Sequence, residues 1–154
     1  MPRACLIILL AAACPLLSAC GDSTSSSRDP ASIAPAYIAS ANAICTRQLA
    51  RLNGLTMPVS AEAAVSYLPR ALSILHAETH QLEAIDPPAS GRAQFADALA
   101  GERQLTALLG GFLHELQTGL VELSAFAHVQ ARGNALRAEI DSHFRRAGLA
   151  RCAN

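Results

Sequence analysis

Residues 61–88 read AEAAVSYLPRALSILHAETHQLEAIDPP, and this stretch decides the fold. Mostly apolar side chains recur in it three and four residues apart, at Val65, Leu68, Leu72, Leu75, Thr79 and Leu82. That spacing is typical of an α-helix with one buried face. Ser60 is suited to cap the start of the helix, and Pro87-Pro88 ends it. We therefore expect a helix over 61–85 whose apolar face other helices must cover.

Three further stretches have the same period, and the expected helices cover 36–53, 91–118 and 121–147. Gly54 and Gly119 follow two of them, Ser90 precedes the middle one, and Gly148 suits a left-handed cap after the last. The apolar positions of the last are Phe126, Val129, Gly133, Leu136, Ile140 and Phe144. Short connections leave consecutive helices antiparallel. We therefore predict an all-α, up-down-up-down four-helix bundle in which the last helix packs beside the first.

Charge and composition narrow the function. The chain has 154 residues, with 12 Arg and no Lys against 12 acidic residues, so it lacks the basic field that nucleic-acid binding requires. Neither a Gly-rich phosphate loop nor a G-x-S-x-G turn occurs in the sequence. We therefore expect no nucleic-acid partner, no catalytic residue and no cofactor.

Residues 1–20 read MPRACLIILLAAACPLLSAC. The order of Arg3, an apolar run over 4–17 and small residues before Cys20 is that of a secretion signal. As a helix, the run of about 14 residues reaches about 21 Å, which is short of the ~30 Å hydrocarbon core. The pattern therefore predicts a signal peptide and not a permanent membrane span.

Leu17-Ser18-Ala19-Cys20 resembles the lipobox of bacterial lipoproteins. The resemblance implies that Cys20 is alkylated with diacylglycerol and that the signal is cut just before it. Fatty chains such as palmitate would then hold the protein on a bacterial membrane, facing the extracytoplasmic side. An ordinary signal cleaved after Ala19 would instead release a free protein.

Residues 21–35, GDSTSSSRDPASIAP, contain too few large apolar groups to fold by themselves. A flexible coil of about 15 residues spans roughly 20 Å on average, enough to lift a domain off lipid headgroups. We expect three parts: a signal peptide over 1–19, the lipidated cysteine and a flexible tether over 20–35, and the bundle over 36–154.

The cysteine count follows from this processing. Cys5 and Cys14 leave with the signal and Cys20 carries lipid, which leaves two of the five cysteines, Cys45 and Cys152. In an oxidising compartment these two most simply form one disulfide, and the predicted bundle brings the end of its last helix toward the first. Two unrelated buried thiols are the alternative.

A second resemblance covers most of the mature chain. Its motifs are Ala41–Cys45 (ANAIC), Pro87-Pro88 and Arg146–Ala153 (RAGLARCA). They are similar to those of small secreted or lipid-anchored helical-bundle proteins of high-GC bacteria. This resemblance implies no particular activity.

His76 and His80 are the residues most suggestive of a metal site, because histidines four apart share one face of a helix. Glu83 continues this stripe, and antiparallel pairing of the two middle helices is expected to put Asp97 near Thr79. A metal site of His76, His80, Glu83 and Asp97 is therefore conceivable. Polar side chains at the edge of a solvated helix face are the simpler explanation.

Glu102 falls where the heptad count of its helix expects a core residue. A buried carboxylate is costly unless it is paired, and we expect the drift of a helix against heptads to turn Glu102 to the boundary. Arg137, Asp141 and Arg145 lie four residues apart, which is typical of a solvated helix face.

Together these patterns predict a lipid-anchored extracytoplasmic protein that acts as a binding or envelope-structural module rather than an enzyme. Its expected partners are the membrane, through the anchor, and an envelope protein. The alternative is a bundle that binds a metal or a small ligand through His76 and His80. Arg47 and Arg51 would suit an anionic ligand, although two charges are weak evidence.

Overall fold

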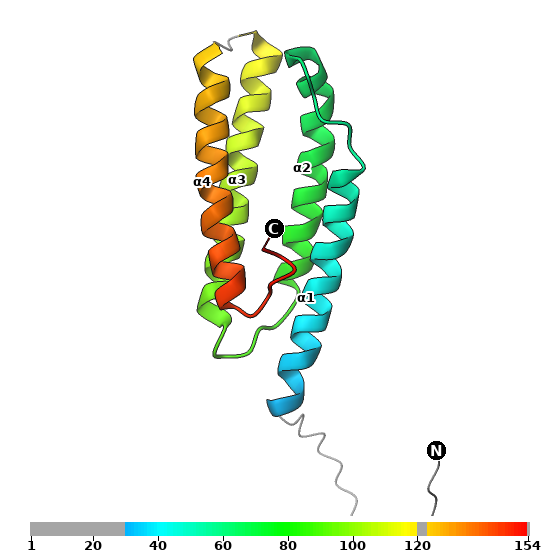
Figure 1. Cartoon of the computed structure of the whole chain (residues 1–154), viewed down its shortest axis with the longest axis vertical. Coiled ribbons are helices and arrows are strands. Elements are labelled where there is room, and N and C mark those ends of the chain that lie inside the picture. The colour runs from blue at the N-terminus through cyan, green and yellow to red at the C-terminus, as the bar shows by residue number, and fades with distance from the viewer. Residues whose placement is uncertain (1–29, 120–122, 154) are drawn as a thin grey trace, which may run out of the picture.

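The computed structural model describes residues 30–119 and 123–153. The described part contains four α-helices and no strand: α1 (Pro30–Asn53), α2 (Ala61–Glu83), α3 (Arg92–Thr118) and α4 (Leu123–Arg146). The helices run alternately up and down (Figure 1), which confirms the predicted all-α bundle. None of them is long and apolar enough to cross a membrane. The predicted signal peptide, Cys20 and residues up to 29 lie outside the described residues.

The start of α1 differs from the prediction. The helix begins at Pro30, so the last six residues of the predicted flexible tether, 30–35, are helical. Proline is well suited to the first position of a helix, where its missing N–H has no partner to lose. Pro35 lies inside the helix and does not end it.

The other helix ends lie within two residues of the predicted ones. The Ser60 side chain accepts a hydrogen bond from the backbone N–H of Ala63 at 3.2 Å, which confirms it as the cap of α2. Gly91, and not Ser90, caps α3, and it contributes no side-chain hydrogen bond. Gly148 has φ +82°, and the N–H of Leu149 donates to Phe144 C=O at 2.8 Å, which completes a Schellman motif.

The prediction that the last helix packs beside the first is wrong. Each helix contacts the next one along the chain, but no Cα atom of α1 lies within 8 Å of one of α4. The C-terminal tail after α4 occupies the space between these two helices instead (Figure 1). The turn at Gly148 sends the tail back toward α1, and a second turn, in which the N–H of Cys152 donates to Leu149 C=O at 3.0 Å, takes the place of a direct helix contact.

A disulfide joins Cys45 of α1 to Cys152 of the tail, with the two Cα atoms 5.1 Å apart. Leu149, which is fully buried, packs between the same elements. Beside them the rings of Tyr37 and Phe95 meet edge to face, with their centroids 5.6 Å apart. The predicted pairing of the two remaining cysteines is therefore present, and it fixes α1 to the lower half of the bundle.

The pair α3 and α4 packs more closely than side chains alone would allow. A Cβ atom built on Gly101 would lie 2.6 Å from Cγ1 of Ile140, a residue with no exposed surface. Gly101 therefore lets the two backbones approach, and any larger residue there would displace Ile140 from the core.

We predict that Cys45→Ser together with Cys152→Ser lowers the free energy of unfolding by about 2–5 kcal/mol, because the bridge closes a loop of 107 residues. Denaturant unfolding followed by circular dichroism measures the loss. A reductant should shift the midpoint of the native chain and leave that of the double variant unchanged. A native midpoint that does not respond to the reductant would contradict the prediction.

Candidate functional site

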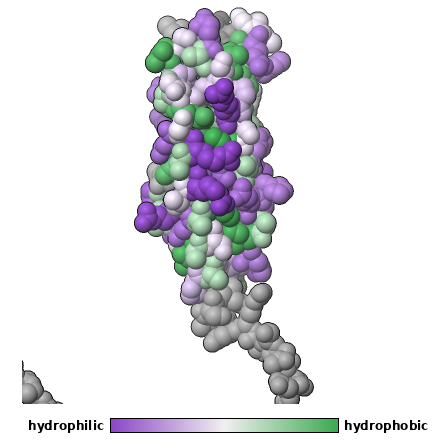
Figure 2. Space-filling view, turned by 90° about the vertical axis from the view of Figure 1, so that its right-hand side faces the viewer, coloured by the Kyte–Doolittle hydropathy of each residue, from purple (hydrophilic) through white to green (hydrophobic). Residues whose placement is uncertain are grey.

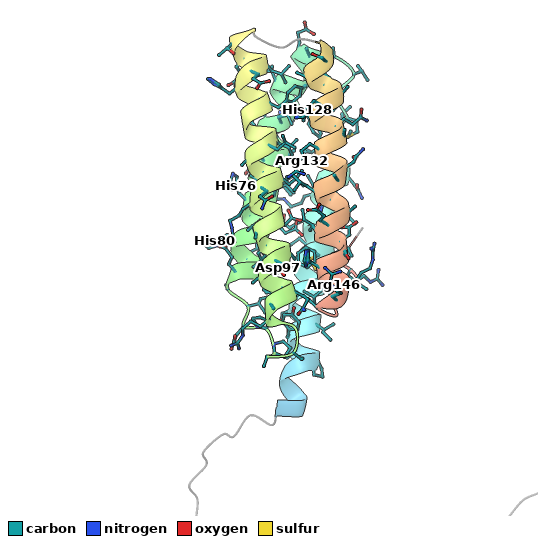
Figure 3. All side chains as sticks on the ribbon, turned by 90° about the vertical axis from the view of Figure 1, so that its left-hand side faces the viewer. His76, His80, Asp97, His128, Arg132 and Arg146 are labelled. Carbon is teal, nitrogen blue, oxygen red and sulfur yellow. A yellow bond between two sulfur atoms is a disulfide. The ribbon has the colours of Figure 1, made fainter. Side chains whose placement is uncertain are left out.

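The structure separates the four residues of the predicted metal site. His76, His80 and Glu83 line one shallow hollow of about 740 Å³ between α2 and α3. Figure 3 shows His76 and His80 on the outer side of α2, with Asp97 apart from them between α3 and α4. Asp97 Oδ2 lies 3.7 Å from Nδ1 of His143 on α4.

The predicted register of α2 against α3 is the reason for this error. It placed residue 93 opposite Glu83, whereas the Oε1 atom of Glu83 lies 2.7 Å from Nη1 of Arg103. The connection over 84–91 is long enough to let α3 begin below the end of α2 (Figure 1). Asp97 therefore lies below the C-terminal end of α2, beyond the reach of His76 and His80 (Figure 3).

The surroundings of the histidine pair do not favour a metal. Arg103 neutralises Glu83, the only carboxylate among the residues that line this hollow. Among the described residues, no group of three or more His, Cys, Asp or Glu side chains is arranged to hold a metal ion.

The interior of the bundle holds the charges that we expected on its surface. Glu102 of α3 is only 1% exposed, so its expected boundary position is wrong. Nη1 of Arg137 donates to Oε1 of Glu102 at 3.3 Å, while Oε2 of Glu102 is buried without a hydrogen bond. Asp141 is also buried, so its expected place on a solvated face is wrong, whereas Arg145, which lies 3.9 Å from Asp141, is exposed as predicted. The ion pair with Arg137 explains why the chain accepts Glu102 in its core.

Glu78 of α2 completes what we call the buried carboxyl cluster: Glu78, Glu102 and Asp141, with Arg137. Burial raises the pKa of Glu78 to about 7, and the charge of Glu102 adds to the rise while Arg137 opposes it. Burial also raises the pKa of Glu102, with Arg137 opposing and Asp141 adding. Arg145 lies 3.9 Å from Asp141, so Arg137 is left to offset the charges of Glu78 and Glu102, and the raised pKa of Glu78 lets this pair hold a proton near neutral pH.

An apolar groove lies at the upper end of the bundle in Figure 1, where α1 has already ended at Asn53 and the other three helices continue. The apolar positions predicted along α4, which form its apolar seam, are buried in its lower half and partly exposed in its upper half. Ile140 and Phe144 in its lower half are fully buried, whereas Phe126 in its upper half is 37% exposed and Val129 is half-buried. The upper part of the seam therefore lacks the cover that α1 and the tail provide below.

The groove has a volume of about 670 Å³. It is lined by Met57, Pro58, Val59, Ser60, Ala61, Ala64, Tyr67, Leu68, Leu109, Phe112, Phe126, Val129 and Gln130. No charged side chain is among them. The rings of Phe112 and Phe126 meet edge to face in its wall, with centroids 4.9 Å apart.

Exposed large apolar side chains gather at this groove. Val59 is 99% exposed, Met57 70% and Phe126 37%, and they are three of the four such residues in the described part of the chain. The fourth, Ile38, lies near Gly148 at the other end of the molecule. A gathering of this kind marks a binding surface more often than a chance arrangement.

Comparison with protein-family models, with curated proteins and with solved structures finds no match for this chain. The candidate site therefore stands on the geometry of the groove and of the buried carboxyl cluster.

We predict that Glu78→Gln makes the protein more stable than the native chain at pH 8, by about 1–3 kcal/mol, and equally stable at pH 4. A folded-state pKa of about 7, above the ordinary value of 4.5, gives stability that is present at low pH and lost as the pH rises between these values. Denaturant unfolding at pH 4, 6 and 8 measures the difference.

Glu62→Gln is the matched control. Hydrogen bonds from its backbone and from Ser60 lower the pKa of the exposed Glu62, so its replacement should bring no gain at pH 8. A difference between Glu78→Gln and the native chain that is the same at all three pH values would show that Glu78 is not protonated in the folded state.

Proposed function

We propose that the protein is a lipid-anchored extracytoplasmic binding protein, not an enzyme, and that its apolar groove takes an uncharged apolar ligand such as the acyl chain of a lipid. The observation that carries this proposal is the groove, where the apolar seam of three helices is left without a fourth helix. The lipobox sequence at Leu17–Cys20 supports the anchor.

The position of the groove supports a ligand that does not come from the anchoring membrane itself. α1 has 24 residues and is therefore about 36 Å long, and the groove lies beyond its C-terminal end. The chain enters α1 at the opposite end (Figure 1). A bundle anchored through Cys20 would thus present the groove to the space outside the bilayer.

The lining of the groove indicates the class of ligand. Pockets of about 300–1,000 Å³ with apolar walls and a few polar groups are typical sites for small molecules. Here the polar groups are Tyr67, Gln130 and Ser60, none of which carries a charge at neutral pH. A charged ligand would lose its hydration without gaining an ion pair, so an uncharged apolar chain is the better fit.

We predict that Cys20→Ser moves the protein from the membrane fraction to the soluble fraction, because the thiol is the proposed acylation site. Fractionation of cells that incorporate labelled palmitate measures both the location and the loss of label. A variant that stays in the membrane fraction would contradict the proposed lipid anchor at Cys20, but it would not bear on the proposal that the groove binds an apolar ligand.

We predict that the purified full chain binds N-phenyl-1-naphthylamine, a neutral apolar fluorescent probe, and that Val59→Asp together with Phe126→Asp weakens this binding by about tenfold or more. Val59 is 99% exposed, and Phe126 lies at the surface with only its ring contact to Phe112 to lose, so the helices should stay folded. Fluorescence titration measures the dissociation constant, and circular dichroism checks the fold.

Ile38→Asp is the matched control, because Ile38 is equally exposed at the other end of the molecule. Its probe binding should equal that of the native chain. Equal weakening in Ile38→Asp, or a native dimer that the groove variants convert to a monomer in light scattering, would count against a small-molecule groove.

A further inference from the structure

The outer face of α1 and α2 carries arginines without acidic partners. The sequence has no acidic residue between positions 30 and 61, so α1 carries only Arg47 and Arg51 as charged side chains. Arg70 lies on the neighbouring part of α2 and is exposed. In Figure 2, which shows this side of the molecule, the most hydrophilic residues form a column along its middle.

Neutral amides hold two of these guanidinium groups in place. Nη2 of Arg47 donates to Oε1 of Gln81 at 2.7 Å, and Nη1 of Arg51 donates to Oε1 of Gln48 at 3.0 Å. Gln48 is only 1% exposed, so the group that orients Arg51 is itself fixed in the core. An amide positions a guanidinium group without neutralising its charge.

Some arginines elsewhere in the described chain pair with carboxylates, although Arg132 on α4 does not. Arg92 lies 3.3 Å from Asp86, and Arg103 lies 2.7 Å from Glu83. Arg70, in contrast, makes no ion pair or hydrogen bond with any residue between 30–119 and 123–153. On the face formed by α1 and α2, no carboxylate of the described residues forms an ion pair with Arg47, Arg51 or Arg70, so this face carries positive charge in a chain whose formal net charge is zero.

Two of the arginines meet at one hollow. Arg51 from α1 and Arg70 from α2 both line a depression of about 520 Å³, together with Ser73 and the chain at Gly54 and Leu55. The hollow is thus lined by one arginine from each of the two helices and by Ser73 of α2. No carboxylate is among the residues that line it.

We propose that this hollow binds a phosphate group carrying two negative charges, as in inorganic phosphate or a phosphate monoester. A guanidinium group donates two parallel hydrogen bonds to phosphate oxygens, and two such groups with a hydroxyl suit a tetrahedral anion better than a planar carboxylate. Arg51 lies in the last turn of α1, where a positive charge stabilises the helix dipole, so Arg51 has a structural role without any ligand. Arg70 lies in the middle of α2, where the helix dipole gives a positive charge no such role. This site is separate from the apolar groove and does not depend on its ligand.

Isothermal titration calorimetry of the purified full chain with inorganic phosphate at pH 8 and low ionic strength tests the proposal. We expect one saturable site, and binding weaker by about tenfold or more in the variant Arg51→Gln with Arg70→Gln. Arg70→Lys, which keeps the charge but loses the planar fork, should fall between the two. Because Arg70 has no partner in the fold, its single replacement by Gln should also weaken binding while circular dichroism stays unchanged.

Arg92→Gln is the control for net charge, since it removes the same charge at a site paired with Asp86. Its affinity for inorganic phosphate should match that of the native chain. No saturable heat with the native chain, or equal binding by all the variants, would overturn the proposal.

A second titration distinguishes two sources of phosphate. Glycerophosphoglycerol is a soluble phosphodiester that stands for a phospholipid headgroup, and we expect it to bind more weakly than inorganic phosphate because it carries one negative charge. Tighter binding of the diester would overturn the assignment to a doubly charged phosphate.

Discussion

The bridge between Cys45 and Cys152 is the constraint on which the arrangement of the helices depends. Because no Cα atom of α1 lies within 8 Å of one of α4, α1 is held mainly by α2 on one side and by the tail that carries Cys152 on the other (Figure 1). Tyr37 and Leu149 pack in the same region, so the bridge lies in a continuous core and is not an isolated link. The bridge sets how far α1 extends along the bundle.

The offset of α1 has consequences at both ends of the molecule. At one end α1 extends past the other helices, and at the other it stops at Asn53 while they continue (Figure 1). The groove beside Phe126 and Val129 exists because no helix covers the seam at that level. A bundle whose four helices were in full register would have buried these residues and left no such surface. The same offset therefore separates the end where the chain enters from the end that is open to a ligand.

The helices and the bridge could be predicted from the sequence, whereas the contacts between helices could not. Apolar periodicity and the breakers Ser60, Pro87 and Gly148 are local signals, and they gave the four helices to within two residues except at Pro30. The position of Asp97 depends on the path of the connection over 84–91, which no local pattern encodes. Glu102 can be buried because Arg137 on another helix donates a hydrogen bond to it, and a contact between two helices cannot be deduced from the pattern within either one. The apolar positions Phe126 and Val129 are part of the groove, but the sequence pattern shows only that a helix face is apolar and not whether a neighbouring helix covers it.

Under the proposed export, the place of Cys152 after the last helix sets the order in which the bridge can form. A chain that crosses a membrane from its N-terminus exposes the thiol of Cys45 while Cys152 is still 107 residues behind it, so the bridge can close only after every helix has emerged. During that interval the first helix has only its neighbour α2 to hold it. Under that proposal, the yield of correctly bridged protein is expected to depend on whether the thiol of Cys45 stays reduced until Cys152 reaches the same side of the membrane.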